Sequence, residues 1–241
     1  MKFPNIDYSF WLQKWNESIG NKRTYSNIYS RRFLDIDMNL LDCELRINDQ
    51  IKGFVEETGS LNNVSIIENV VDLIYAWGGR SGRMFYFNKS GLGLPRLLIL
   101  EEEHLKFYNM GISLAVKADP SALDAFKKVP GIGPSFGSKH AFFWSLQAPN
   151  RLIIIDSKIC GALGYSNIAE LLLQFSYSRI IDDFTNKSKE VFGVNDGSKV
   201  ERALFAFHNN YFLNSNNGFR RDPLFRVDEN EFERLKVILK I

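Results

Sequence analysis

The chain has 241 residues and a mass of 27.8 kDa, which suffices for one large domain or two small ones with a sizeable core. Hydrophobic residues make up 45% and charged residues 24%, so the composition is that of a folded protein and excludes a disordered or fibrous class. The net charge is +2, and the half from residue 121 onward carries +3. A charge of this size does not by itself indicate nucleic-acid binding.

Apolar runs such as RLLIL and RLIII are far shorter than a membrane span, so the sequence predicts no contact with a membrane. The N-terminal stretch MKFPNIDYSF lacks the continuous apolar segment of a signal peptide, and we expect a cytoplasmic protein. Cys43 and Cys160 are too few for a disulfide framework or a four-cysteine metal site. The three histidines are scattered along the chain, so we expect no metal cofactor.

Hydrophobic periodicity predicts a mainly α protein. NVSIIENVVDLIYAWGG predicts a helix that ends at the two glycines. Asp119 and Pro120 are suited to begin another helix, which runs to Val129. Further helices are predicted by FGSKHAFFWSL, IAELLLQFSYSRIIDDFTNKSKEVFG, SKVERALFAFHNNYFL and NEFERLKVILKI. The best strand candidates are MFYFN, RLIII and the first ten residues. The loop-rich string GGRSGRMFYFNKSGLGLPR, which includes MFYFN, carries four basic residues that either touch a nucleic-acid backbone or are solvated: Arg80, Arg83, Lys89 and Arg96.

The stretch VPGIGPSFGSKHAFFW, residues 129–144, predicts a helix–hairpin–helix. Gly131 and Gly133 permit the backbone conformations that a two-helix hairpin needs, and Ile132 between them is expected to fill the seam between the helices. Pro134 suits the first position of the second helix. The backbone N–H groups at the start of that helix are suited to bind a phosphate. Such contacts position a DNA duplex without reading its sequence. A plain corner between two helices is the alternative interpretation.

An aspartate follows the hairpin in the string NRLIIIDSKICGALGY. Asp156 ends an apolar run and precedes helix-forming residues, so we expect its carboxylate to cap a helix. Lys139 lies on the second helix of the hairpin. The aromatic residues Phe142, Phe143 and Trp144 follow it, and we expect an apolar neighbourhood that favours the unprotonated, nucleophilic amine.

At this point the sequence resembles the helix–hairpin–helix DNA glycosylases of base-excision repair. WGGRSG, GIGPSFGSKHAFFW, LIIIDSKICGAL and VERALF are most similar to the bacterial oxoguanine-glycosylase-like branch. The resemblance covers roughly residues 66–212, and its most specific part is 129–163. It implies a glycosylase-like helical fold with little β structure over residues 66–241, with the helix–hairpin–helix at 121–147. Residues 1–65 are expected to form an N-terminal region packed on this helical body.

The resemblance also implies roles for single residues. Asp156 matches the essential aspartate, which stabilises positive charge on the sugar and helps activate the nucleophile. Lys139 is the best match to the lysine that displaces the base and forms a Schiff base. Double-stranded DNA is the implied partner, and family members often hold a monovalent cation at the hairpin. The implied DNA-binding residues are Pro130, Gly131, Ile132, Gly133, Ser135 and Ser138.

The sequence departs from the family pattern at the lysine. In the better-known oxoguanine glycosylases the lysine stands two residues after the second hairpin glycine, where this chain has Ser135. Lys139 lies one helical turn further on, on the same face. Either Lys139 is presented to the substrate from there, or water activated by Asp156 is the nucleophile and the enzyme only removes the base. No four-cysteine tail follows, which excludes the iron–sulfur branch.

A glycosylase must take its target base out of the helix, so it needs an aromatic-lined pocket. Trp77 and Trp144 are the candidates, and each is equally well read as a core residue. Two other functions stay open at this stage: a non-catalytic helix–hairpin–helix DNA-binding module of a repair or anti-phage system, and a helical interaction protein. The excised base is not identified by the residues, and no obligate protein partner is evident.

Overall fold

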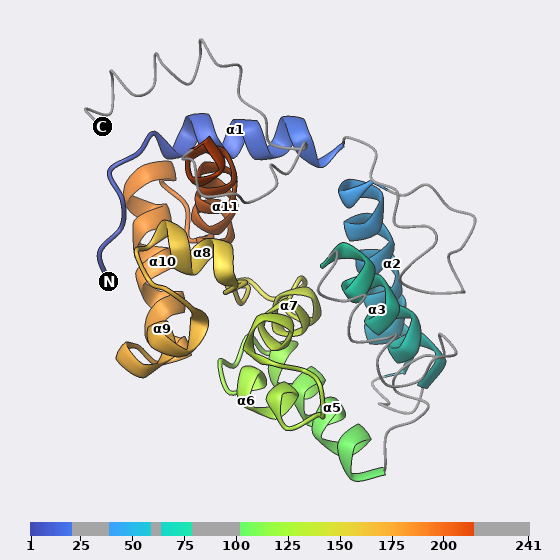
Figure 1. The fold of residues 1–241 in the computed structure, drawn as a ribbon. Helices are drawn as coiled ribbons and strands as arrows, with labels where there is room; N and C mark the ends of the chain where they lie inside the picture. The colour runs from blue at the N-terminus through green and yellow to red at the C-terminus, as the bar shows by residue number, and fades with distance from the viewer. Residues whose placement is uncertain (21–38, 59–63, 79–101, 215–241) are drawn as a thin grey trace. The chain divides into compact units, whose positions relative to one another are not determined.

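The computed structural model describes residues 1–20, 39–58, 64–78 and 102–214 of the chain. These residues form helices and no strand, so the predicted mainly α class is confirmed. The helices, in chain order (Figure 1), are α1 (Tyr8–Ile19), α2 (Leu40–Thr58), α3 (Val64–Trp77), α5 (Glu102–Ala115), α6 (Ala122–Lys127), α7 (Pro134–Trp144), α8 (Ser157–Ala162), α9 (Ile168–Gln174), α10 (Tyr177–Phe192) and α11 (Gly197–Asn214).

The helices belong to two compact units. The first unit combines Met1–Ile19 with Ile155–Ile241, and the second is Gly20–Ile154. The chain therefore starts in the first unit, builds the second, and returns to the first just before Asp156. The predicted division at residue 65 does not follow these units, and it stays a prediction. No helix in the described ranges is long and apolar enough to cross a membrane.

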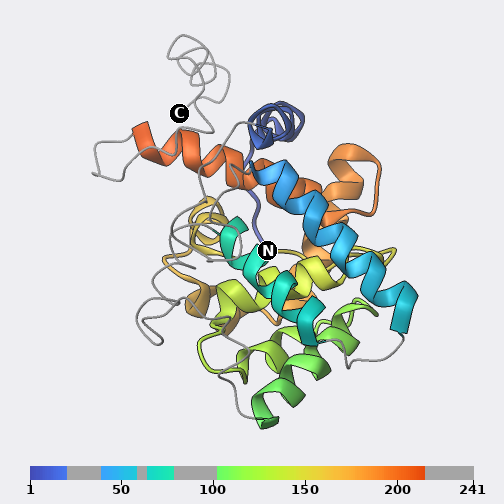
Figure 2. The same ribbon diagram turned by 90° about the vertical axis from the view of Figure 1, so that its right-hand side faces the viewer.

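The second unit is built around α7. Every residue from Phe136 to Trp144 is buried, because α5 and α6 pack on α7 and so do α2 and α3, which lie next to each other in Figure 2. A helix without a polar face is stable only when it is covered on all sides in this way. The phenol of Tyr108 in α5 accepts a hydrogen bond from Trp144 Nε1 at 3.1 Å and shares another with His140 Nδ1 at 2.9 Å.

The first unit is built around α11, which contacts α1, α8 and α10. Both views show α1 crossing α11 (Figures 1 and 2), and the contact is aromatic. The rings of Trp11 and Phe207 lie 5.6 Å apart, and those of Trp15 and Phe205 lie 5.3 Å apart, both edge to face. Burying two tryptophan side chains fixes α1 to the C-terminal part of the chain, although the two are far apart in sequence.

Three of the predicted secondary-structure elements differ from the structure. The first ten residues form no strand, because Tyr8, Ser9 and Phe10 begin α1. The segment 151–155 is not a strand, although residues 152–155 are buried, and the N–H of Leu152 donates to Ser145 Oγ at 3.0 Å. The long helix predicted over residues 168–193 is two helices, because Ser176 caps α10 by accepting from the N–H of Arg179.

The remaining element predictions fall into two groups. The helices predicted at 63–79, in the hairpin and at 198–213 are confirmed as α3, α6, α7 and α11. The strand candidate MFYFN, the basic residues of segment 79–101 and the helix predicted for NEFERLKVILKI lie outside the described residues.

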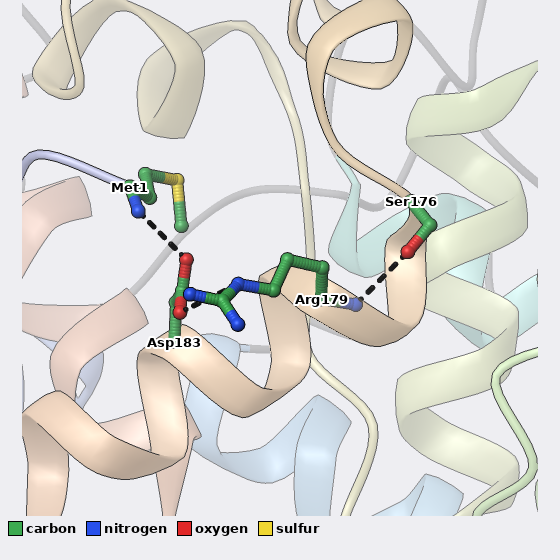
Figure 3. A network of polar contacts seen from close by, with 4 residues as sticks. All are labelled: Met1, Ser176, Arg179 and Asp183. Carbon is green, nitrogen blue, oxygen red and sulfur yellow. Dashed lines mark hydrogen bonds and ion pairs between the residues drawn. The ribbon is translucent and has the colours of Figure 1, made fainter.

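Figure 3 shows a polar network that fixes the N-terminus in the first unit. Asp183 of α10 is only 8% exposed. Its carboxylate forms an ion pair with the α-amine of Met1 at 2.8 Å and another with Arg179 Nε at 3.1 Å. Ser176 holds the backbone of the same turn through the N–H of Arg179. The carboxylate thus joins the first residue of the chain to α10.

Replacing Asp183 by asparagine is expected to destabilise the protein by about 2 kcal/mol, because both cations lose a nearly buried counter-charge. Thermal unfolding measures the change. The matched control is Asp182→Asn, at the neighbouring exposed carboxylate, which we expect to change stability by less than about 0.5 kcal/mol. Equal effects of the two substitutions would contradict this account of the network.

Candidate functional site

The helix–hairpin–helix is present in the second unit. α6 begins later than predicted: its N-cap is Ser121 rather than Asp119, and Asp119 Oδ1 accepts from the N–H of Ser121. The chain then turns, with Gly131 in the left-handed region at φ 84°, where glycine is favoured. Gly133, which was expected to supply a conformation special to glycine, is instead extended at φ −77° and ψ 175° and is the N-cap of α7. Pro134 is the first residue of α7, as predicted.

The two helices of the motif meet closely at Gly137. A Cβ atom there would lie 3.0 Å from Leu123 Cδ1 of α6 and 3.7 Å from Ile132 Cγ2. Ile132 is 5% exposed, so the prediction that it fills the seam between the helices is confirmed. The apolar seam holds the hairpin rigidly on the end of α7.

The N-terminal end of α7 is open to solvent. Pro130 and Gly133 are exposed, and no side chain caps this end of the helix. A Cβ atom built on Gly133 meets no atom within 4 Å, so the space beside this backbone is empty. An extended, side-chain-free residue at a helix N-terminus lets a phosphate approach the backbone N–H groups closely.

Lys139 does not extend into solvent. Its side chain is buried, with the residue 5% exposed, and it runs back one turn along α7. The ammonium Nζ donates to Ser135 Oγ at 3.2 Å and lies 5.5 Å from the centre of the Phe136 ring. The side-chain nitrogen therefore lies beside the second residue of α7, at the hairpin end of the helix.

The aromatic residues expected around Lys139 contact other groups. Phe142 faces the Arg151 guanidinium at 4.7 Å, Phe143 packs on Trp77, and Trp144 packs on Phe54. A helical side chain leans toward the N-terminus of its helix, so Lys139 runs toward residues that precede it rather than toward residues 142–144. The ring beside the amine is instead that of Phe136, which lies within the preceding turn.

The remaining candidates of the second unit lie in its interior. Ser138 has no exposed surface, and its hydroxyl donates to the carbonyl of Ser135 at 3.0 Å, so we leave it out of the proposed interface. Trp144 is 1% exposed and its indole N–H is satisfied by Tyr108. Trp77 is 8% exposed and its ring lies 5.2 Å from that of Phe143. These are the contacts of core residues, and a role in a base pocket stays a prediction for both tryptophans.

Asp156 lies in the first unit and caps α8 as predicted. Its backbone is extended, and Oδ1 accepts from the N–H groups of Lys158 at 2.9 Å and Ile159 at 3.2 Å. The residue is 9% exposed. Two backbone donors fix the carboxylate in one orientation and hydrogen-bond its charged form.

A histidine that the sequence analysis did not single out lies close to this cap. The ring of His208, on α11, packs against α8 so tightly that a Cβ on Gly161 would lie 2.3 Å from its Nε2. Burial lowers the pKa of His208 to about 4, the charge of Lys158 lowers it as well, and the charge of Asp156 opposes this. No spacing along the chain pointed to His208, because the contact depends on how α11 packs on α8.

The neutral state of His208 is expected to make stability depend on pH. The unfolded chain binds the proton near the ordinary pKa of 6.5 and the folded chain only near 4, so stability falls as pH is lowered through this window. His208→Gln removes the dependence, and its thermal unfolding temperature should fall less than that of the wild type between pH 7.5 and 4.5. Equal changes of the unfolding temperature with pH in the wild type and in His208→Gln would contradict this role of His208. His104→Gln, on α5, is the control and should follow the wild type.

Among the described residues, no group of three or more histidine, cysteine, aspartate or glutamate side chains is placed to hold a metal ion. A monovalent cation at the hairpin backbone stays a prediction from the resemblance. Comparison of the chain with protein-family models, curated proteins and solved structures finds no match. The glycosylase interpretation therefore depends on the motifs of the sequence and on the geometry of Lys139, Asp156 and the hairpin.

Proposed function

We propose that the protein is a DNA glycosylase that removes a damaged or modified base and then cleaves the strand through a Schiff base on Lys139. The observation that carries the proposal is the course of the Lys139 side chain. Its amine lies 3.2 Å from the hydroxyl of Ser135, which occupies the position where the resembled enzymes carry their lysine. The one-turn departure in sequence is thus compensated by a side chain that runs back along α7.

The reaction needs a nucleophile and a group that stabilises positive charge. The unprotonated amine of Lys139 forms a bond to C1′ of the sugar, and the bond from C1′ to the base breaks with its electron pair going to the base, which takes up a proton. Nζ then gives up one proton, the bond from C1′ to the ring oxygen O4′ breaks and O4′ takes up that proton, which leaves a protonated imine between Nζ and C1′. Loss of a proton from C2′ allows the 3′ phosphate to leave, which cuts the strand.

Asp156 serves the first of these steps in the proposal. As the base departs, C1′ acquires positive charge, and a fixed carboxylate stabilises that charge. The hydrogen bonds from the N–H groups of Lys158 and Ile159 hold the carboxylate without neutralising it.

Double-stranded DNA is the proposed partner, and the hairpin is the proposed binding site for its phosphate backbone. Exposed backbone at Pro130 and Gly133 and the uncapped start of α7 would bind a phosphate of the strand. The proposal includes a cytoplasmic location, where DNA is accessible, and requires neither a metal cofactor nor a protein partner.

Replacing Gly133 by valine is expected to weaken DNA binding about tenfold and equally for all duplex sequences, because the side chain fills the space where a phosphate approaches. The fold should persist, since φ is −77° and no atom lies within 4 Å of the new Cβ. Fluorescence anisotropy with several duplexes measures the affinity. Gly53→Val, on α2, also meets no atom within 4 Å at its Cβ and serves as the control. A loss confined to particular sequences would contradict a phosphate grip.

The proposed activity is tested with duplexes that each carry one altered base, including oxidised guanine, or one abasic site. Base release is followed by chromatography, and borohydride is added to reduce any imine to a stable adduct. We expect release of at least one base and a covalent adduct. Base release without an adduct would make water the nucleophile. Binding without either reaction would favour the non-catalytic DNA-binding module.

A further inference from the structure

We propose that Ser135 is a positioning residue that holds the Lys139 amine ready at the hairpin end of α7; this inference rests on the proposed function. A lysine on a helix surface ordinarily extends its flexible side chain into water. Here the side chain is buried and its nitrogen is 3.2 Å from Ser135 Oγ. Ordering such a side chain is entropically unfavourable, so the contacts that hold it must compensate.

Two neighbouring residues provide these contacts. The hydroxyl of Ser135 accepts an N–H of the amine, and the face of Phe136 lies 5.5 Å from it, within the range of a cation–π interaction. One contact fixes the nitrogen from the hairpin side and the other from the adjacent ring. Both contacts hold the amine at the hairpin end of α7.

Both holding groups are themselves fixed. Ser135 follows Pro134, whose ring restricts the backbone, and the Ser135 carbonyl accepts from Ser138 Oγ at 3.0 Å. Phe136 stacks on Tyr75 of α3 with centroids 4.7 Å apart, and a Cβ on Gly78 would lie 2.7 Å from its Cε1. Groups locked by their own packing hold a reactive side chain more accurately than mobile ones do.

The chemistry of a hydroxyl suits this position. It accepts a hydrogen bond from the amine in either protonation state, whereas a carboxylate in the same place would favour the ammonium form, which cannot attack. A displacement of about 1 Å of a reacting group slows a reaction up to about 100-fold. Removing the hydroxyl of Ser135 should therefore slow imine formation even when all the DNA is bound.

The test uses duplexes with a preformed abasic site, so base removal is not required. At saturating enzyme, where the affinity for DNA does not limit the rate, Ser135→Ala should form the borohydride-trapped adduct about tenfold more slowly than the wild type. Ser135→Thr restores the hydroxyl and should recover the rate to within about threefold. A wild-type rate in Ser135→Ala, or no recovery in Ser135→Thr, would overturn the inference while the proposed function stands.

A second measurement does not depend on activity. Acetic anhydride labels amines, and peptide mapping by mass spectrometry gives the labelling rate of Lys139. The rate should rise several-fold in Ser135→Ala and return toward the wild type in Ser135→Thr, because a released amine is more accessible. An unchanged rate would overturn the inference even if the wild-type protein forms no adduct with DNA. Failure of the wild type to form an adduct, with the expected labelling pattern, would overturn the Schiff-base proposal alone.

Discussion

Replacing Asp156 by asparagine is expected to reduce the rate of base release at least about 1,000-fold, because the charge that stabilises the developing cation is removed. The amide keeps an oxygen that can accept from the N–H groups of Lys158 and Ile159, and asparagine is as good an N-cap as aspartate. Stability should therefore change by less than about 1 kcal/mol. Single-turnover base release and thermal unfolding measure the two quantities.

The matched control is Asp196→Asn. Asp196 also accepts from a backbone N–H, that of Ser198 at the start of α11, and belongs to the same unit as Asp156. The same substitution there should leave base release within about twofold of the wild type. Near-normal base release by Asp156→Asn would remove the aspartate from the mechanism, and with it the glycosylase interpretation.

Replacing Lys139 by glutamine is expected to abolish both the borohydride-trapped adduct and strand cleavage, because an amide nitrogen cannot form an imine with the opened sugar. Base release would at most persist slowly, with water activated by Asp156 as nucleophile. Glutamine retains a polar end that can reach Ser135, so the hairpin and DNA binding should be affected little. Gel analysis of the trapped adduct and of strand cleavage at an abasic site measures the loss.

Two other lysines serve as comparisons for Lys139. Lys187→Gln removes an amine on α10 that pairs with Glu190, and it should trap DNA like the wild type. Lys158→Gln removes the amine two residues after Asp156 and should also retain the adduct. An adduct that persists in Lys139→Gln but disappears in Lys158→Gln would transfer the nucleophile to α8.

Features that depend on local interactions could be predicted from the sequence. The Asp156 cap, Pro134 at the first position of α7 and the burial of Ile132 follow from short-range rules about backbone donors, φ angles and glycine-flanked turns. The helices with clear periodicity, α3 and α11, were predicted for the same reason.

Features that depend on contacts between distant segments could not be predicted. The apolar run at 151–155 has the composition of a strand, but it is a segment without regular secondary structure that is buried over residues 152–155 and leads to Asp156. The pairing of Trp11 with Phe207, which joins α1 to α11, has no local signal. His208 reaches α8 only because Gly161 leaves room for its ring. The Lys139 side chain runs back along α7, so the Phe136 ring, which precedes it in the sequence, lies beside its amine.

The most direct test of the Schiff-base mechanism is to identify the amine that becomes covalently bound to the DNA. Wild-type protein is incubated with a duplex containing an abasic site, reduced with borohydride and digested with nuclease and protease, and the modified peptide is sequenced by mass spectrometry. The account predicts a sugar remnant on Lys139, with Lys158 and the α-amine of Met1 unmodified. Modification of another amine, or no modified peptide at all, would contradict Lys139 as the nucleophile.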